Sequence, residues 1–231
     1  MSRQRATQDG EQTLSEPEVI VQPVVLAGGR SRRFGSNKAL HPWRGRALID
    51  HVLDVVRLTM TPREIWAGVG HLARHPRLVA HLRSDPHMVC LEDDPHMDGP
   101  AAGLSAAFEQ AALRRLPWVF VCGCDMPTMR IQLLGAMLDL ARNAPASVSA
   151  IVPRTPSTRG RRFEPLHAFY RPERALPHLR AMASAPQHRL QDFIAALPDA
   201  HILDPHALDS LDAQWRLGLH NINTREALHE V

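Results

Sequence analysis

The chain has 231 residues, enough for one large domain or two small ones with a sizeable core. Its net charge is only +3, and one Tyr, four Trp and six Phe offer little surface for stacking bases, so a nucleic-acid partner is not expected. Three cysteines are too few for a disulfide framework, and the sequence shows neither a signal-peptide core nor a membrane-spanning run. We therefore expect a cytoplasmic protein that binds small anions and not membranes.

The apolar pattern along the chain predicts alternating strands and helices. Residues 1–18 are polar and without periodicity, which predicts a disordered tail before a single domain over residues 19–231. The predicted strands are 24–26, 64–69, 89–91, 118–124 and 148–152, and the predicted helices are 47–60, 99–113 and 131–141. This alternation favours a Rossmann-like, doubly wound α/β fold, with a mostly parallel sheet and helices on both faces.

The composition changes after residue 152, where prolines, histidines and arginines dominate to about Leu208. We interpret residues 19–152 as a nucleotide half and residues 153–231 as an acceptor half that carries binding insertions. In a doubly wound sheet, ligands bind at the carboxyl ends of the strands. Three predicted strands end there in polar or flexible segments, which are Gly28-Gly29, Glu92-Asp93-Asp94 and Cys124-Asp125.

The first predicted strand leads into the segment LAGGRSRRFGSNK, residues 26–38. Its paired glycines lack a Cβ, so several backbone N–H groups can face one point, and three arginines and Lys38 add positive charge. Such a loop is suited to a polyphosphate. Lys38 is the only lysine in the chain, which favours a position where a compact ammonium is needed, such as between phosphates. The glycine spacing fits neither the dinucleotide fingerprint nor the P-loop.

Asp125 directly follows a nearly continuous apolar run and precedes Met-Pro, so its carboxylate should lie at the edge of the sheet. Mg²⁺ typically binds one or two carboxylates together with substrate phosphates. An aspartate that only caps the turn is the structural alternative. Because the same chain carries a phosphate-binding loop, we predict Mg²⁺ as the cofactor, held by Asp125.

The pattern L-A-G-G-x-S-x-R-x-G-x-x-K resembles the signature loop of nucleotidyltransferases, and its Ala-Gly-Gly form is most similar to the molybdenum cofactor guanylyltransferase family. Three further segments resemble the same family. CDMP matches its metal aspartate, Asp93 with the downstream GPAAGL matches its nucleoside motif, and NINT at 221–224 matches its N-x-N-T-P segment, with Arg225 in place of proline. Residues 164–168 resemble its acceptor-side segment.

The resemblance implies a nucleotide-diphospho-sugar transferase-like fold and Mg²⁺-dependent transfer of GMP from GTP to the molybdopterin-type molybdenum cofactor, with release of pyrophosphate. It assigns catalysis to Arg33, Lys38 and Asp125, and it implies transient contact with molybdoenzymes or their chaperones. The implied nucleotide-binding residues are Leu26, Ala27, Gly28, Gly29, Lys38, Asp93 and Asp125, and the implied acceptor-binding residues are Arg189, Asn221 and Asn223.

Two alternatives remain at the level of sequence. One is a cytidylyltransferase or a sugar-phosphate nucleotidyltransferase of the same fold, because the guanine base and the pterin acceptor come only from the resemblance. The other is a non-catalytic GTP-binding adaptor that binds the nucleotide without turning it over. The joint presence of Arg33, Lys38 and Asp125 argues against an adaptor.

Overall fold

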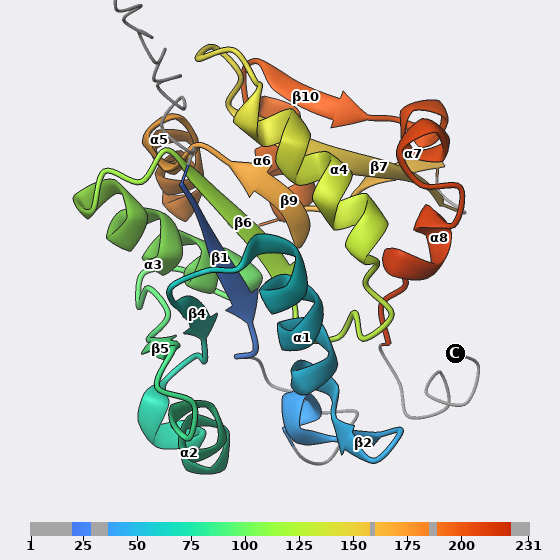
Figure 1. The fold of residues 1–231 in the computed structure, drawn as a ribbon. Helices are drawn as coiled ribbons and strands as arrows, with labels where there is room; N and C mark the ends of the chain where they lie inside the picture. Colours follow the sequence, from blue (N-terminus) through green and yellow to red (C-terminus); the bar gives the residue numbers. More distant parts are fainter. Residues whose placement is uncertain (1–19, 29–36, 158–159, 185–188, 223–231) are drawn as a thin grey trace, which may run out of the picture.

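The computed structural model describes residues 20–28, 37–157, 160–184 and 189–222, and the fold below concerns these residues. An eight-stranded sheet runs through the molecule in the order β10-β7-β9-β6-β1-β4-β5, with β8 paired to β7 (Figure 1). Its strands are β1 (Val21–Leu26), β4 (Ile65–Gly68), β5 (Met88–Leu91), β6 (Trp118–Gly123), β7 (Ala150–Ser157), β8 (Gly160–Phe163), β9 (His167–Tyr170) and β10 (Ala200–Leu203). A separate small hairpin consists of β2 (Pro42–Trp43) and β3 (Arg46–Ala47).

The centre of the sheet is parallel. Strand β1 lies between β4 and β6 and pairs in parallel with both, so that Leu26 is opposite Gly68 on one side and Gly123 on the other. Strands β4 and β5 are parallel, as are β7 and β10. Only β9 and β8 run against their neighbours. The predicted fold, a mostly parallel α/β sheet with helices on both faces, is confirmed.

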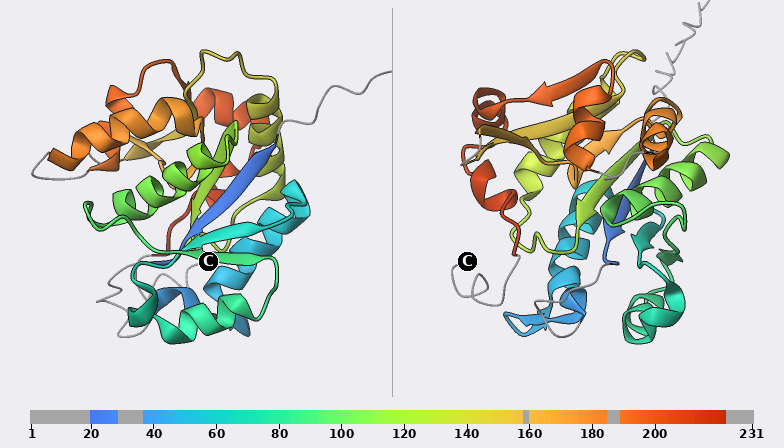
Figure 2. Two further views of the ribbon diagram at one scale, coloured as in Figure 1. Left: turned by 90° about the vertical axis from the view of Figure 1, so that its left-hand side faces the viewer. Right: turned by 180° about the vertical axis from the view of Figure 1, so that it is seen from behind.

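Different helices cover the two faces, as the opposite views in Figures 1 and 2 show. One face packs against α1 (Leu48–Met60) and α4 (Ile131–Arg142), and the other packs against α3 (Pro100–Leu113), α5 (Pro172–Ala181) and α6 (Leu190–Ala196). The central strand serves both cores, because Val25 points to the first face and Val24 to the second. The remaining helices are α2 (Pro76–Arg83), α7 (Pro205–Leu211) and α8 (Trp215–Gly218), with short 3₁₀ turns at Lys38–Leu40, Leu72–Arg74 and Met182–Ser184.

The predicted helices form where the apolar pattern places them. In α1, a stripe at helical spacing is buried, including Ile49, Val52 and Val56. Helix α3 begins at Pro100, whose fixed φ and missing N–H suit the first helical turn. Its alanine-rich surface lets it pack closely onto the sheet, since Ala101, Ala107 and other small residues are fully buried.

The sequence pattern does not reveal several elements. Helix α2 is only eight residues long, and its buried positions are too few for a clear periodic signal. After residue 152 the chain contributes β8, β9 and β10 to the same sheet, and β9 lies between β6 and β7. Strand β7 also extends to Ser157, beyond the predicted end.

The predicted disordered tail lies outside the described residues. In the part of the chain that is described, no helix is long and apolar enough to cross a membrane.

One buried polar side chain stands out in the core. His167, the first residue of β9, is fully buried, with its ring edge against Phe120 at a centroid separation of 5.4 Å. Neither ring nitrogen has a hydrogen-bond partner among the described residues. Burial lowers the pKa of His167 from 6.5 to about 3, so the ring is neutral in the folded protein at neutral pH.

This burial predicts an acid-sensitive stability. Between pH 6.5 and about 3 the unfolded chain binds a proton at His167 that the folded protein does not, so stability present above pH 6.5 is lost as the pH falls toward 3. Replacing His167 with Leu should remove this loss. Urea denaturation measures the free energy of unfolding of both proteins. The value for His167→Leu minus that for the wild type should increase by about 1.4 kcal/mol for each pH unit below the unfolded pKa. A difference between the two proteins that does not change with pH would contradict this expectation.

Candidate active site

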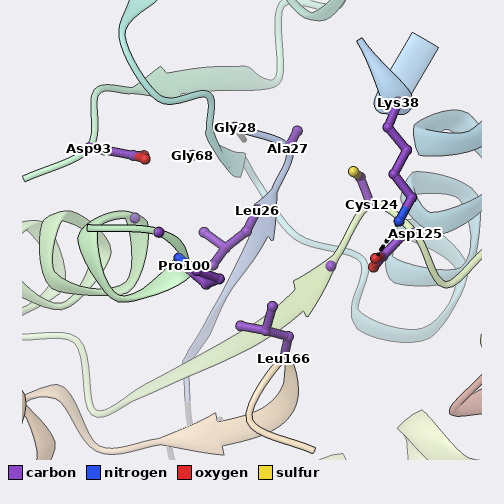
Figure 3. Close-up of a pocket in the computed structure, with 13 residues that line it drawn as sticks. Leu26, Ala27, Gly28, Lys38, Gly68, Asp93, Pro100, Cys124, Asp125 and Leu166 are labelled. Carbon is purple, nitrogen blue, oxygen red and sulfur yellow. Dashed lines mark hydrogen bonds and ion pairs between the residues drawn. The ribbon is translucent and has the colours of Figure 1, made fainter. Parts of the chain in front are cut away.

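A cavity of about 150 Å³ lies at the carboxyl ends of β1, β4 and β6, the three parallel strands at the centre of the sheet (Figure 3). It is lined by the ends of these strands, the segment after β5 with Asp93, the 3₁₀ turn with Lys38, the start of α3, and the turn before β9. Its lining residues are Leu26, Ala27, Gly28, Lys38, Gly68, Asp93, Gly99, Pro100, Gly103, Gly123, Cys124, Asp125 and Leu166. The site therefore lies where a doubly wound sheet binds its ligands.

Gly28 is required by a close approach of two backbones. A Cβ at position 28 would lie 2.3 Å from the backbone nitrogen of Gly70 and 2.7 Å from the carbonyl carbon of Val69. The N–H groups of Ala27 and Gly28 both donate to the carbonyl oxygen of Gly68, at 2.7 Å each. The neighbouring strand therefore pairs both N–H groups in this structure, and the nucleotide-binding role of Ala27 and Gly28 stays a prediction. Gly29, Arg33 and the rest of the loop to residue 36 lie outside the described residues.

Lys38 and Asp125, 87 positions apart in the chain, meet inside the cavity. The Nζ atom of Lys38 donates to Oδ2 of Asp125 at 2.8 Å, and both side chains are partly exposed (Figure 3). Asn37 fixes the start of the lysine turn, because its Oδ1 accepts a hydrogen bond from the N–H of Ala39 at 3.0 Å. The predicted convergence of these two residues on one cavity is confirmed.

Gly123 makes room for the Asp125 carboxylate. A Cβ at position 123 would lie 2.4 Å from Oδ1 of Asp125, so the carboxylate folds back over the end of β6. Cys124, between them, also lines the cavity, and burial followed by the charge of Asp125 raises the pKa of its thiol to about 12. The thiol therefore stays protonated and is not a nucleophile at neutral pH.

Asp93 lies on the opposite side of the cavity from Asp125 (Figure 3). Its Oδ1 accepts a hydrogen bond from the N–H of Gly70 at 3.2 Å. Burial raises the pKa of Asp93, against the opposing effects of this hydrogen bond and of His75. Position 103 in α3 has to be small, because a Cβ there would approach Oδ1 of Asp93 to 3.2 Å. The two carboxylates thus have separate surroundings, because Asp125 lies beside an ammonium and Asp93 beside the backbone N–H of Gly70.

The acceptor-side residues are only partly assembled around the cavity. Asn221 is next to Ile222, whose N–H donates to the carbonyl oxygen of Asp125 at 2.9 Å, so this segment is attached to the Asp125 turn. Arg189 is an exposed residue at the start of α6 and is not among the described residues that line the cavity. Asn223 lies outside the described residues.

The segment 164–168 is divided between the cavity and the core. Leu166 lines the cavity, whereas His167 is buried in the sheet. Glu164 accepts a hydrogen bond from Oγ1 of Thr155 at 2.8 Å. Burial raises the pKa of Glu164, and the negative charge of Asp125 adds to the rise, while Thr155 and Arg162 oppose it. Glu164 is thus close enough to the site to interact with Asp125 electrostatically.

Sequence reasoning missed the glycines that shape the cavity. Gly68 and Gly123 are the register partners of Leu26 on its two sides, and both line the cavity together with Gly103. A glycine at the carboxyl end of a predicted strand is the signal that could have found the first two, because glycine in a strand often marks a close approach of a ligand or another backbone.

The cavity lies at the carboxyl edge of a parallel sheet and contains strand-end glycines, an ammonium and two separated carboxylates. This combination is typical of α/β enzymes that bind nucleotides. The sequence profile of the MobA-like NTP transferase domain matches residues 23–201, so the chain belongs to this family of nucleotidyltransferases.

Individual relatives agree with this assignment. The chain is 28% identical over 209 residues to a protein from Pyrococcus horikoshii named "Probable molybdenum cofactor guanylyltransferase", covering 90% of this chain and 96% of that protein. It is 29% identical over 170 residues to a protein of the same name from Geobacillus sp., covering 73% and 78% of the two chains. Its fold is similar to the crystal structure of molybdopterin-guanine dinucleotide biosynthesis protein A from Archaeoglobus fulgidus, with a TM-score of 0.68 at 22% identity and coverage of 90% and 95%.

The close approach at Gly28 predicts that Gly28→Ala is destabilising, because its Cβ would meet backbone atoms that cannot move aside cheaply. The expected loss is about 1–3 kcal/mol, as for other overpacked sites. Gly135→Ala is the matched control. Gly135 lies within α4, and a Cβ there would meet only Cγ2 of Thr59 in α1, at an ordinary contact distance of 3.8 Å. That variant should be neutral or more stable by up to about 1 kcal/mol. Urea denaturation measures both, and equal stabilities would contradict the assigned role of Gly28.

Proposed function

We propose that the protein is a Mg²⁺-dependent guanylyltransferase that moves GMP from GTP to the molybdopterin-type molybdenum cofactor and releases pyrophosphate. The observation that carries the proposal is the Lys38–Asp125 contact of 2.8 Å inside a cavity at the carboxyl edge of the sheet. Family membership supports nucleotidyl transfer, and the names of the similar proteins support guanine as the base and the molybdenum cofactor as the acceptor.

The donor set at Asp125 fits a hard cation held mainly by substrate. Among the described residues, no group of three or more His, Cys, Asp or Glu side chains is arranged to hold a metal ion. Asp125 offers one partly exposed carboxylate, and Mg²⁺ typically takes one or two carboxylates plus phosphate oxygens and water. When bound, such a cation offsets the negative charge of the phosphates and orients them.

The reaction then needs positioning and charge stabilisation from the protein. An oxygen of the acceptor phosphate attacks the α-phosphorus of GTP and forms the new P–O bond. The bond from the α-phosphorus to the bridging oxygen breaks, and pyrophosphate leaves with that electron pair. Lys38 is placed to bind the phosphates, because its ammonium already lies in the cavity, and we assign Arg33 to the same task. Phosphate binding by Lys38 would release the Asp125 carboxylate for the cation.

We assign the nucleotide to the side of the cavity lined by Leu26, Ala27, Gly28 and Asp93, with Gly29 continuing the loop. A carboxylate such as Asp93 can accept hydrogen bonds from the N–H groups of a base or from the hydroxyls of a ribose.

We assign the acceptor to the side of Asp125, where Asn221 adjoins the Asp125 turn. We propose Asn223 and Arg189 as its other binding residues. A cytoplasmic location and transient contact with molybdoenzymes or their chaperones are part of the same proposal.

The metal role of Asp125 predicts that Asp125→Asn lowers the rate of pyrophosphate release by about 100-fold or more, as for the loss of a main electrostatic group. Its affinity for GTP without added Mg²⁺ should be kept or increased, because Lys38 no longer shares its charge with a carboxylate. Asp54→Asn is the control, since Asp54 also pairs with a basic residue, Arg46 at 2.6 Å, but on the exposed surface. Unchanged pyrophosphate release in Asp125→Asn would exclude the metal role.

The substrate assignment is tested by measuring pyrophosphate release from GTP, CTP, UTP and ATP, each with molybdopterin-bound molybdenum or with a sugar phosphate as acceptor. We expect release only with GTP and the molybdenum cofactor together. Release with CTP or with a sugar phosphate would favour the other nucleotidyltransferases of this fold. Binding of GTP without any release would favour the adaptor.

A further inference from the structure

The turn that carries Asp125 and the C-terminal segment that carries Asn221 are joined at several points. Residues 124–130 connect β6 to α4, and residues 212–222 run from the end of α7 through α8 to Ile222. The carbonyl oxygen of Asp125 accepts the N–H of Ile222 at 2.9 Å. The Oγ1 atom of Thr128 donates to the carbonyl oxygen of Leu217 at 2.7 Å. Figure 1 shows α8 beside the start of α4, where these contacts lie.

The strongest of these contacts is an ion pair between Arg130 and Asp212. Both the Nε and the Nη2 atoms of Arg130 donate to the carboxylate, the second to Oδ1 at 3.1 Å. The Asp212 side chain is 5% exposed and that of Arg130 is 22% exposed. The Oδ1 atom of Asp212 also accepts the N–H of Gln214 at 3.0 Å. Two parallel hydrogen bonds fix an angle as well as a distance, which a single contact would not do.

The charge state of Asp212 agrees with this geometry. Burial alone would raise the pKa of Asp212, but the hydrogen bonds from Arg130 and from the N–H of Gln214 outweigh it and leave the pKa below its usual value. The carboxylate is therefore ionised at neutral pH and keeps its full attraction for Arg130.

Close packing adds to the pairing. A Cβ at position 218 would lie 3.1 Å from Cγ of Arg130 and 3.3 Å from its backbone nitrogen, so α8 packs directly on the residue that precedes α4. Trp215 and Ile222, from the same segment as Gly218, are buried. The segment is thus held at Asp212 and again at Ile222, and Asn221 is the residue just before the second attachment.

We propose that Arg130 and Asp212 are positioning residues that hold the Asn221 segment in place relative to the Asp125 carboxylate. The distance between Asn221, which binds the acceptor, and Asp125, which binds the metal, is thereby fixed. This inference rests on the proposed function, because it assigns the acceptor to Asn221. Neither residue lines the cavity, so both act through the segments they join. A buried ion pair is a weak source of net stability, whereas its two-point geometry gives orientation.

The test is Asp212→Asn, which keeps the shape of the side chain and removes its charge. We expect kcat/KM for the molybdenum cofactor acceptor to fall by about 10- to 100-fold, as for a small displacement at a reacting centre. The Kd for GTP should stay as in the wild type, because the nucleotide residues lie on the other side of the cavity. Arg130→Lys, which keeps the charge but not the fork, should give a smaller loss. Arg180→Gln removes an exposed ion pair with Glu109 and is the matched control.

The outcomes separate positioning from stability. A lower melting temperature with an unchanged kcat/KM for the acceptor would show that the pair is only structural and would overturn the inference. If Asp212→Asn does not fold, the double variant Arg130→Met with Asp212→Leu removes both charges together, and a wild-type kcat/KM for the acceptor in that protein would also overturn it.

A failure of the proposed function gives a different result, because the wild type would then transfer no GMP to the molybdenum cofactor. In that case kcat/KM of the wild type and of the variants is compared with the nucleotide and acceptor that the wild type does turn over.

Discussion

The contact between the Lys38 ammonium and the Asp125 carboxylate is the interaction around which the site is arranged. It joins the loop after β1 to the turn after β6, so two strands that neighbour each other in the sheet present opposite charges to one cavity. An ammonium is suited to phosphate and a carboxylate to a divalent cation. Under the proposed function, a metal-bound nucleoside triphosphate brings both partners and replaces the internal pair with two favourable contacts.

This arrangement depends on glycines, which have no side chain, as much as on charges. Gly28 lets the tip of β1 touch the backbone beyond β4, and Gly123 leaves space for the Asp125 carboxylate. The two N–H groups at the tip of β1 are taken by the Gly68 carbonyl, so they hold the strands together. The positive charge around the described site consequently comes from Lys38 and from the N-terminus of α3, where Pro100 and the preceding Gly99 line the cavity.

The second half of the chain is built into the sheet that the first half begins. Strand β9 inserts antiparallel between β6 and β7, and the turn before it places Leu166 in the cavity. Burial, and to a lesser degree the negative charge of Asp125, raises the pKa of Glu164 in the same turn. The chain then returns through α7 and α8 to the Asp125 turn, where Arg130, Asp212 and Ile222 attach it. The residues proposed to bind the nucleotide and Asn221, which is proposed to bind the acceptor, thus belong to one sheet and its connections, and their spacing depends on contacts between distant parts of the sequence.

Much of the first half could be predicted from sequence alone, because its signals are local. Apolar runs and stripes identify β1, α1, α3, β6 and α4, and the position of a polar residue just after a strand identifies Asp93 and Asp125 as site residues. The later elements could not be found in this way. Strand β9 has only four residues, and its place between β6 and β7 follows from sheet pairing, which leaves no local pattern.

The amino-acid sequence by itself determined the fold class and the candidate charges of the site, since these follow from periodicity and residue type over short windows. Only the tertiary structure decided that Lys38 lies 2.8 Å from Asp125 and that the Ala27 and Gly28 N–H groups donate to the Gly68 carbonyl oxygen. It also decided that Arg130 donates two hydrogen bonds to the Asp212 carboxylate. Each of these contacts joins residues that are 40 to 87 positions apart, and the distance between such residues is set by the packing of the whole sheet and its helices.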